Sequence, residues 1–202
     1  MTAQINDIFH YQGVDYSIAG ISEDEFFNPQ IFKLRLSAPS SSCWRGYQLK
    51  FKVEDSLLIL DTLLVNLAKD DYKSIEGPVI NGVKPFLYKR GDKEVGWQYD
   101  SLFNNHYLNL NYHVKYSGGL LLADGFIPDL YVHMGFHPAW KYENVWELII
   151  DNGILINEYD RSEDMAEIRK KYIELKNKYE LDNNLEELRN FLIDSFDRRY
   201  NI

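Results

Sequence analysis

The sequence predicts an α+β fold, with an antiparallel β-sheet core built of successive hairpins and a C-terminal α-helical hairpin. One pattern occurs at 47–60, 112–126 and 145–159: an alternating strand, a short polar or glycine-containing break, and a strand rich in Leu and Ile. Connections this short join only antiparallel strands. After residue 160 the apolar residues recur every three or four positions, the period of an amphipathic helix. The three segments share few identities, so they fit the common pattern of antiparallel sheets, with duplication as the alternative.

Alternation of apolar and polar residues places the strands of the first half. A Gln12-Gly13 break between two short alternating runs predicts an opening hairpin over 8–18. Further strands are expected at 31–36, 47–53 and 57–67. Gln48, Lys50 and Lys52 alternate with apolar residues, so this face of its strand is expected to be solvated.

The second half predicts further strands and the clearest turn of the chain. A long strand is expected at 107–115 and another at 130–136, both from alternation. Asn152-Gly153 predicts a tight hairpin, because Asn-Gly favours the positive φ angles of such turns. Residues 68–102 give the weakest signal.

The tail after residue 160 predicts two helices. Ser162 is the expected N-cap of the first helix, and Glu163 and Asp164 suit its N-terminal dipole. Asn183 with Glu186 resembles a capping box for the second helix. The first apolar stripe consists of Met165, Ile168, Tyr172, Leu175 and Tyr179, and the second of Leu185, Leu188, Leu192 and Phe196. We therefore expect a single domain over 1–202, with a β-rich core at 5–160 and a helical tail at 162–200 packed on it.

Charge and cysteine content limit the classes of function. The 202 residues carry a net charge of −9, which argues against a nucleic-acid partner and permits a basic protein partner. The simpler explanation is that moderate negative charge keeps the protein soluble. Cys43 is the single cysteine, so no intrachain disulfide is expected and a reducing compartment fits. The N-terminal residues do not have the pattern of a signal peptide, and no apolar run is long enough to span a bilayer. The sequence thus predicts a cytoplasmic protein without a membrane partner.

Two histidines lie in the stretch with the most candidate binding residues. His133 and His137 are four residues apart, a spacing that suits a shared metal on a helix. Gly135 and Pro138 disfavour a helix, and an extended strand would hold the two rings roughly 13 Å apart. We therefore expect no metal and no cofactor, and the alternative role of these histidines is structural, at the rim of a pocket.

Other candidates come from separate parts of the chain. Arg45 lies beside Cys43 and could lower the pKa of that thiol, although a lone cysteine is more often a small buried apolar residue. If a pocket exists, the candidate catalytic residues are Arg45, His113, His133 and His137. The candidate binding residues that would form its walls are Trp44, Tyr131 and Trp140.

The sequence supports two functions from different classes. The first is a non-catalytic cytoplasmic protein that binds another protein, of immunity or antitoxin type against a basic partner, since the common nucleotide-binding and catalytic motifs are missing. The alternative is an enzyme or a binder of a small polar ligand, which requires the His, Arg and Trp candidates to converge on one pocket. The protein is expected to be a monomer, or a homodimer that buries the apolar stripe of its tail helix.

Overall fold

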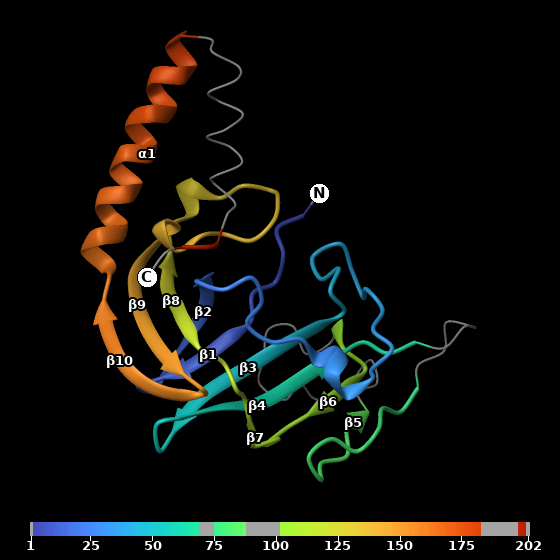
Figure 1. The fold of residues 1–202 in the computed structure, drawn as a ribbon. Helices are drawn as coiled ribbons and strands as arrows, with labels where there is room; N and C mark the ends of the chain where they lie inside the picture. The colour runs from blue at the N-terminus through green and yellow to red at the C-terminus, as the bar shows by residue number, and fades with distance from the viewer. Residues whose placement is uncertain (1, 69–74, 88–101, 183–197, 201–202) are drawn as a thin grey trace.

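The computed structural model describes residues 2–68, 75–87, 102–182 and 198–200. Within these ranges β-strands predominate and one α-helix follows them near the C-terminal end (Figure 1). The helix is α1 (Ser162–Asp182). The strands are β1 (Ile8–Tyr11), β2 (Val14–Ile21), β3 (Tyr47–Glu54), β4 (Leu57–Val65), β5 (Phe86–Leu87), β6 (Asn105–Tyr107), β7 (Tyr112–His113), β8 (Gly118–Phe126), β9 (Tyr142–Asp151) and β10 (Ile154–Asp160).

The strands form one sheet that curls back on itself. Their order is β10-β9-β8-β2-β1-β3-β4-β6-β5, with β7 paired to β4. β10 also pairs with β4 where Ile154 faces Leu57, and the amide of Leu58 donates to the carbonyl of Gly153 at 2.8 Å. The strands from β10 to β4 therefore form a barrel that closes at this one point (Figure 1).

The antiparallel sheet is confirmed in outline, with one exception. β1 and β3 run parallel, with Phe9 beside Phe51. A parallel pair needs a long crossover. The connection between the β1–β2 hairpin and β3, residues 22–46, supplies it.

Three of the predicted tight turns are confirmed. The β1–β2, β3–β4 and β9–β10 hairpins turn at Gln12-Gly13, Asp55-Ser56 and Asn152-Gly153, and all six residues have positive φ. Two consecutive residues of positive φ make the turn whose twist matches that of the flanking strands.

The predicted hairpin at 112–126 is wrong, because its two strands do not pair with each other. β7 pairs with β4, whereas β8 pairs with β2 and β9. The long strand predicted at 107–115 is also broken, with Asn109 at φ 55° and Asn111 at φ 46°. Asparagine tolerates this left-handed backbone better than most residues, and an extended strand cannot contain it.

Two other predicted strands are loops with a short 3-10 turn. The segment 31–36 begins inside a 3-10 turn at Pro29–Phe32, which ends at Lys33, where φ is 56°. Residues 130–136 follow a turn at Pro128–Leu130. The alternation at 31–36 arises because Phe32, Leu34 and Leu36 pack on the barrel core from this loop.

The inner face of the barrel forms the main core. Its fully buried side chains include Phe9, Phe51, Leu60, Leu122 and Leu148. The loop residues Phe26 and Phe27 pack on Phe51, with ring centroids 4.5 and 6.0 Å away. Apolar burial of this extent is the main driving force for closing the sheet.

Helix α1 starts where the sequence predicts, with a different cap. Ser162 is inside the helix, and its hydroxyl accepts from the amide of Val145 at 3.1 Å. The carboxylate of Asp160 instead accepts from the amide of Ser162 at 2.9 Å. Tyr172 stacks on Trp140, with ring centroids 4.5 Å apart and the planes 6° from parallel. This contact fixes the helix on the segment that precedes β9.

The second predicted helix, with its capping box, lies outside the described residues. The described part of the chain contains a single C-terminal helix, so the helical hairpin is not established. No helix within the described ranges has both the length and the apolar run needed to cross a lipid bilayer.

Candidate functional site

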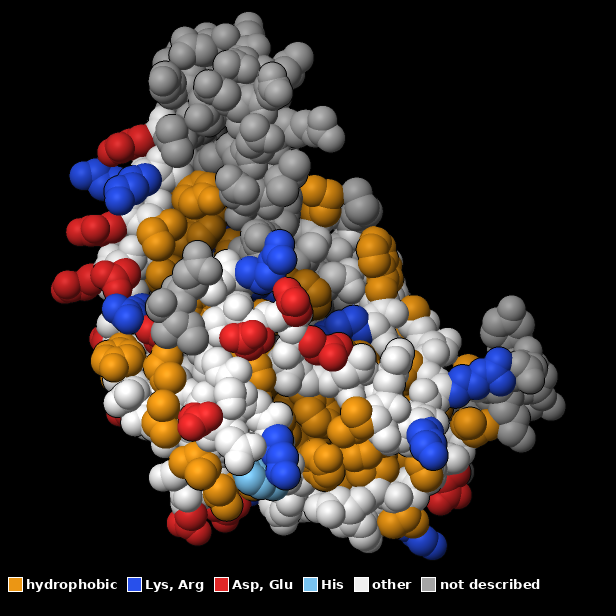
Figure 2. All heavy atoms as spheres, in the orientation of Figure 1, with side chains coloured by type: hydrophobic (Ala, Val, Ile, Leu, Met, Phe, Trp, Pro, Cys, Tyr) orange, Lys and Arg blue, Asp and Glu red, His pale blue; other side chains and the backbone are white. Residues whose placement is uncertain are grey.

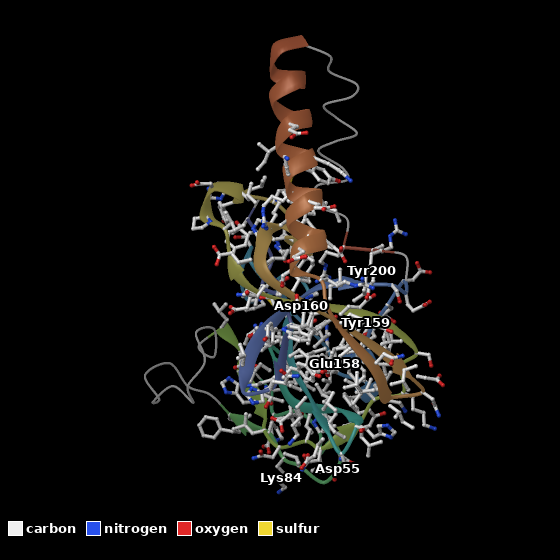
Figure 3. The ribbon with its side chains drawn as sticks, turned by 90° about the vertical axis from the view of Figure 1, so that its left-hand side faces the viewer. Asp55, Lys84, Glu158, Tyr159, Asp160 and Tyr200 are labelled. Carbon is white, nitrogen blue, oxygen red and sulfur yellow. The ribbon has the colours of Figure 1, made fainter. Side chains whose placement is uncertain are left out.

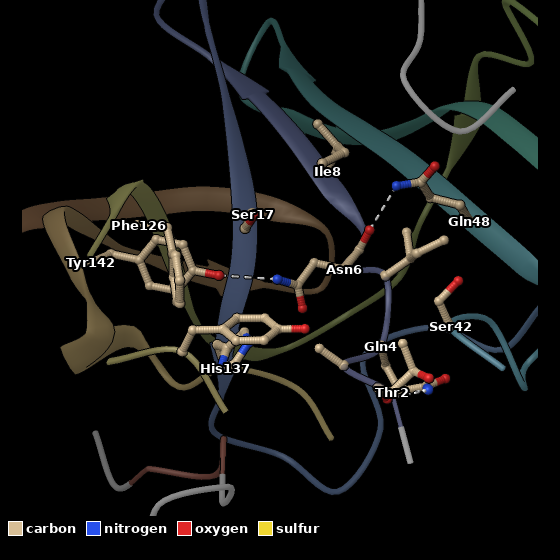
Figure 4. A pocket seen from close by; sticks show the side chains of 13 residues that line it. Thr2, Gln4, Asn6, Ile8, Ser17, Ser42, Gln48, Phe126, His137 and Tyr142 are labelled. Carbon is tan, nitrogen blue, oxygen red and sulfur yellow. Dashed lines mark hydrogen bonds between the residues drawn. The ribbon is translucent and has the colours of Figure 1, made fainter. Parts of the chain in front are cut away.

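A cavity of about 530 Å³ lies on the outer face of the barrel (Figure 4). Its floor comes from β1, β2 and β3, and its other walls come from the N-terminal residues and the connection between β8 and β9. The amide of Gln4 donates to the carbonyl of Gly135 at 2.7 Å and joins these two walls. The lining residues are Thr2, Ala3, Gln4, Ile5, Asn6, Ile8, Ser17, Ser42, Gln48, Phe126, Tyr131, His137 and Tyr142.

Strand alternation decides which side chains reach the cavity. Asn6, Ser17 and Gln48 line it, whereas their chain neighbours Asp7, Ile18 and Tyr47 line a smaller cavity on the other side of the sheet. Successive side chains of extended backbone point to opposite faces, so one short stretch of sheet serves both cavities.

Three side chains of the cavity, two buried and one half-buried, have buried polar atoms without hydrogen-bond partners in the described structure. These atoms are Oδ1 of Asn6, Oε1 of Gln48, and both ring nitrogens of His137. Gln48 is 2% exposed and His137 is 7% exposed. Buried polar groups are almost always paired, and each unpaired group costs about 1–3 kcal/mol. A molecule in this cavity could supply the missing partners of several of these atoms at once.

The orientation of the Gln48 amide follows from a bond that is present (Figure 4). Nε2 of Gln48 donates to the backbone carbonyl of Asn6 at 2.8 Å, and Nδ2 of Asn6 donates to the hydroxyl of Tyr142 at 3.1 Å. Because a carbonyl oxygen only accepts, Gln48 must turn its NH₂ group toward Asn6. The oxygen of Gln48 is therefore left as an acceptor.

His137 is a neutral ring among aromatic side chains. Burial, and next the positive charge of Lys141, lower its pKa to about 4. The ring centroid lies 4.8 Å from that of Phe126 and 5.3 Å from that of Tyr131. A neutral imidazole offers one N–H donor and one acceptor. Since His137 is neutral at pH 7, none of the described side chains that line the cavity carries a charge.

The structure brings three of the predicted site residues together. Tyr131 and His137 line the cavity, and the ring of His133 lies 4.9 Å from that of Tyr131 at the exposed rim. The bend at Gly135, where φ is 61°, lets both histidines approach Tyr131. No group of three His, Cys, Asp or Glu side chains that could hold a metal occurs in the part of the chain that the structure describes.

The other four predicted residues lie elsewhere. Arg45 lines the smaller cavity, where it pairs with Asp7. His113 is exposed beside the β9–β10 turn, with Nε2 3.4 Å from the carbonyl oxygen of Gly153. Trp44 is 58% exposed, and Trp140 is buried under Tyr172. The four catalytic candidates therefore do not meet in one pocket.

The thiol beside Arg45 is buried. Cys43 is 1% exposed, and its Sγ donates to the carbonyl of Tyr47 at 3.4 Å. Burial raises the pKa of the thiol despite the opposing effect of Arg45. The thiolate is the reactive form, so this cysteine is poorly suited to act as a nucleophile.

Asn6 and Gln48 are the functional candidates that sequence reasoning missed. Gln48 lies on the face of its strand that was expected to be solvated, and the β8–β9 connection covers that face. The sequence signal for this site is that Gln48 is uncharged, whereas Lys50 and Lys52 on the same face are charged. Its significance can be recognised only once the fold is known.

Comparison with known proteins gives no relative from which a function could be inferred: no family model, no curated protein and no solved structure matches this chain. The cavity and its chemistry are therefore the basis for the proposals below.

Proposed function

We propose that the protein binds a small, uncharged, planar polar molecule in the outer cavity, of the class of free nucleobases. The observation that carries this proposal is the set of buried polar atoms without partners on Asn6, Gln48 and His137. Two amide oxygens accept hydrogen bonds, and a neutral imidazole donates one and accepts one. A ring with both N–H and C=O groups on its edge complements them.

The walls favour a flat ligand without charge. Phe126, Tyr131 and Tyr142 surround the imidazole of His137, and aromatic faces stack on planar rings. With His137 neutral, no charged side chain from the described part of the chain lines the cavity. A phosphate or carboxylate would lose its hydration without a cation to replace it.

We propose binding without catalysis, in the cytoplasm. The buried Cys43 has a raised pKa, and among the described residues His137 has no hydrogen-bonded neighbour of the kind that orients a catalytic base. A single cysteine suits a reducing compartment.

Titration calorimetry with uracil, cytosine, adenine and guanine tests the ligand class. We expect at least one base to bind, and we expect Gln48→Leu to weaken that binding by roughly tenfold because a donor of the ligand then lacks its acceptor. Gln30→Leu is the matched control, since Gln30 is exposed and outside the cavity. If none of the four bases binds, or if both variants bind equally well, this function is wrong.

We propose protein binding as a second function, at the outer edge of β10. β10 pairs with β9 along its length, but with β4 only at Ile154. Beyond that point Ile156 is 53% and Tyr159 is 45% exposed. Figure 3 shows Glu158, Tyr159 and Asp160 along this strand on the side of the molecule that faces the viewer. An unpaired strand edge is a template for one more strand.

The acidic side chains of β10 determine which kind of partner fits this edge. Glu158 and Asp160 would face like charges in a symmetric pair of copies, so a basic extended segment of another protein fits better than a homodimer. A peptide of alternating Lys and Val is the probe, with alternating Glu and Val as its control. We expect the basic peptide alone to shift the backbone amide NMR signals of β10, and less so at high salt. Equal shifts with both peptides would contradict the charge argument.

A further inference from the structure

The smaller cavity, of about 160 Å³, has a charged wall and an apolar wall. It lies between the end of β2 and the start of β3, next to residue 198. Asp7, Arg45 and Arg198 line one part of it. The apolar part consists of Ile18, Ile21, Phe26 and Phe27. An amphipathic lining of this kind recognises a small molecule with a charged end and an apolar end.

Arg45 and Asp7 neutralise each other. Nη1 and Nη2 of Arg45 donate to the two carboxylate oxygens of Asp7, at 2.7 and 3.0 Å. Asp7 also accepts from the amide of Leu49 at 2.9 Å, and Arg45 also donates to the carbonyl of Ile5 at 3.0 Å. Asp7 is therefore held mainly by Arg45 and the backbone, and it forms no ion pair with a second cation among the described residues.

Arg198 is the second arginine that lines this cavity. Its guanidinium carbon lies 3.8 Å from the ring centroid of Phe136, and Nη1 donates to the carbonyl of Ile18 at 3.1 Å. None of the ion pairs found among the described residues includes Arg198. Burial lowers its pKa to about 10, with the charge of Asp7 opposing this shift and that of Arg45 adding to it, so Arg198 stays protonated at pH 7. A partly buried cation with no ion-pair partner among the described residues can pair with the anionic group of a ligand.

Carboxylates lie at the outer rim of the same cavity. Asp24 and Glu25 line it, and the side chain of Asp24 is 99% exposed. Acidic and basic side chains lie next to one another near the middle of the face drawn in Figure 2. The cavity thus has positive charge inside and negative charge at its mouth.

We propose that this cavity binds a free α-amino acid with an apolar side chain. The carboxylate of the ligand pairs with Arg198, and its ammonium group faces Asp24 and Glu25. The side chain packs on Ile21, Phe26 and Phe27. This site is separate from the outer cavity and does not depend on the function proposed for it.

Three matched probes separate the contributions to binding. L-leucine carries both charges, isocaproate lacks the ammonium group, and isoamylamine lacks the carboxylate. In titration calorimetry with the full chain we expect leucine to bind at least about tenfold more tightly than either analogue, since each lost charged hydrogen bond has about this effect. Isocaproate binding as tightly as leucine would overturn the amino-acid assignment.

Two neighbouring arginines provide the variant and its control. Arg198→Gln removes the guanidinium in the cavity, whereas Arg199→Gln removes one that is exposed and lies 4.0 Å from Asp24. We expect leucine binding to weaken by at least about tenfold in the first variant and to persist in the second. Nucleobase binding should persist in both, so failure here is distinguishable from failure of the proposed function. If leucine does not bind the unaltered chain, or binds Arg198→Gln equally well, the proposal is wrong.

Discussion

The imidazole of His137 packs against the ring of Phe126 with centroids 4.8 Å apart, while neither of its nitrogens has a hydrogen-bond partner in the described structure. A histidine kept for folding would be expected to use at least one nitrogen. Its burial therefore costs stability, and function is a reason to keep such a residue.

We expect His137→Phe to raise the free energy of unfolding by about 1 kcal/mol and to abolish nucleobase binding. Phenylalanine fills a similar space and removes the cost of two buried polar atoms. Urea denaturation measures the first effect and titration calorimetry the second.

Tyr107→Phe is the control, because it also removes a buried polar group, but one that is paired. The hydroxyl of Tyr107 donates to the carbonyl of Pro78 at 2.9 Å. Its loss should lower the free energy of unfolding by about 1 kcal/mol. If both variants lose stability equally, His137 is a structural residue.

The lowered pKa of His137 also predicts a pH dependence of stability. Its pKa is about 4 in the folded protein against 6.5 as the ordinary value. Between these values the unfolded chain binds a proton that the folded chain does not, so stability falls as pH drops from 6.5 toward 4. The loss amounts to roughly 2–3 kcal/mol.

His137→Phe separates this effect from the titration of carboxylates. Asp15 and Asp160 also have lowered pKa values, and they titrate in both proteins alike. Urea midpoints measured from pH 7 to 4.5 should fall less steeply in the variant. Parallel curves would show that His137 titrates normally.

The sequence predicts the local parts of this fold better than its long-range contacts. The three hairpins and the start of α1 depend on turn residues and on periodicity, which neighbours in the chain determine. The parallel pairing of β1 with β3 and the joining of β4 to β10 depend on contacts between distant segments. Alternation at 31–36 predicts a strand because a loop that packs on a core uses the same apolar spacing.

Dependence on contacts between distant segments also limits how much of the site the sequence predicts. Tyr131, His133 and His137 come together because they share one connection, and the sequence stretch marks them as candidates. Asn6 and Gln48 join them only because the β8–β9 connection folds over the outer face of the sheet. In β3 the uncharged Gln48 beside Lys50 and Lys52 is the one sequence signal, and it does not by itself show that this residue is covered.

The ion pair of Arg45 with Asp7 predicts a large difference between two similar substitutions. Asp7→Asn leaves Arg45 partly buried without its carboxylate, and such a loss costs about 3–5 kcal/mol. Asp15→Asn breaks exposed pairs with His10 and Lys50, which contribute about 0–1 kcal/mol. Thermal unfolding of both variants should show a much lower melting temperature for the first alone. Similar melting temperatures would mean that water replaces the carboxylate of Asp7.

The closure of the barrel predicts a comparable contrast between two glycines. Gly13 and Gly153 have nearly the same φ, 81° and 80°, and each is the second residue of a hairpin turn. A Cβ at Gly13 would meet nothing within 4 Å, whereas one at Gly153 would collide with the carbonyl oxygen of Val114 and lie 2.7 Å from Nε2 of His113. Gly13→Ala should therefore lower the free energy of unfolding only by the cost of the left-handed backbone, about 1–2 kcal/mol.

Gly153→Ala adds a displacement of the segment that closes the barrel. Gly153 accepts from the amide of Leu58 and donates to the carbonyl of Tyr116, both at 2.8 Å, so moving this turn disturbs the contact between β10 and β4. We expect its free energy of unfolding to fall by about 3 kcal/mol or more, because backbone oxygens cannot move aside as flexible side chains do. Hydrogen exchange should be faster at Leu58 in this variant and unchanged there in Gly13→Ala. Equal losses of stability in the two variants would show that the junction at Gly153 contributes nothing beyond the turn itself.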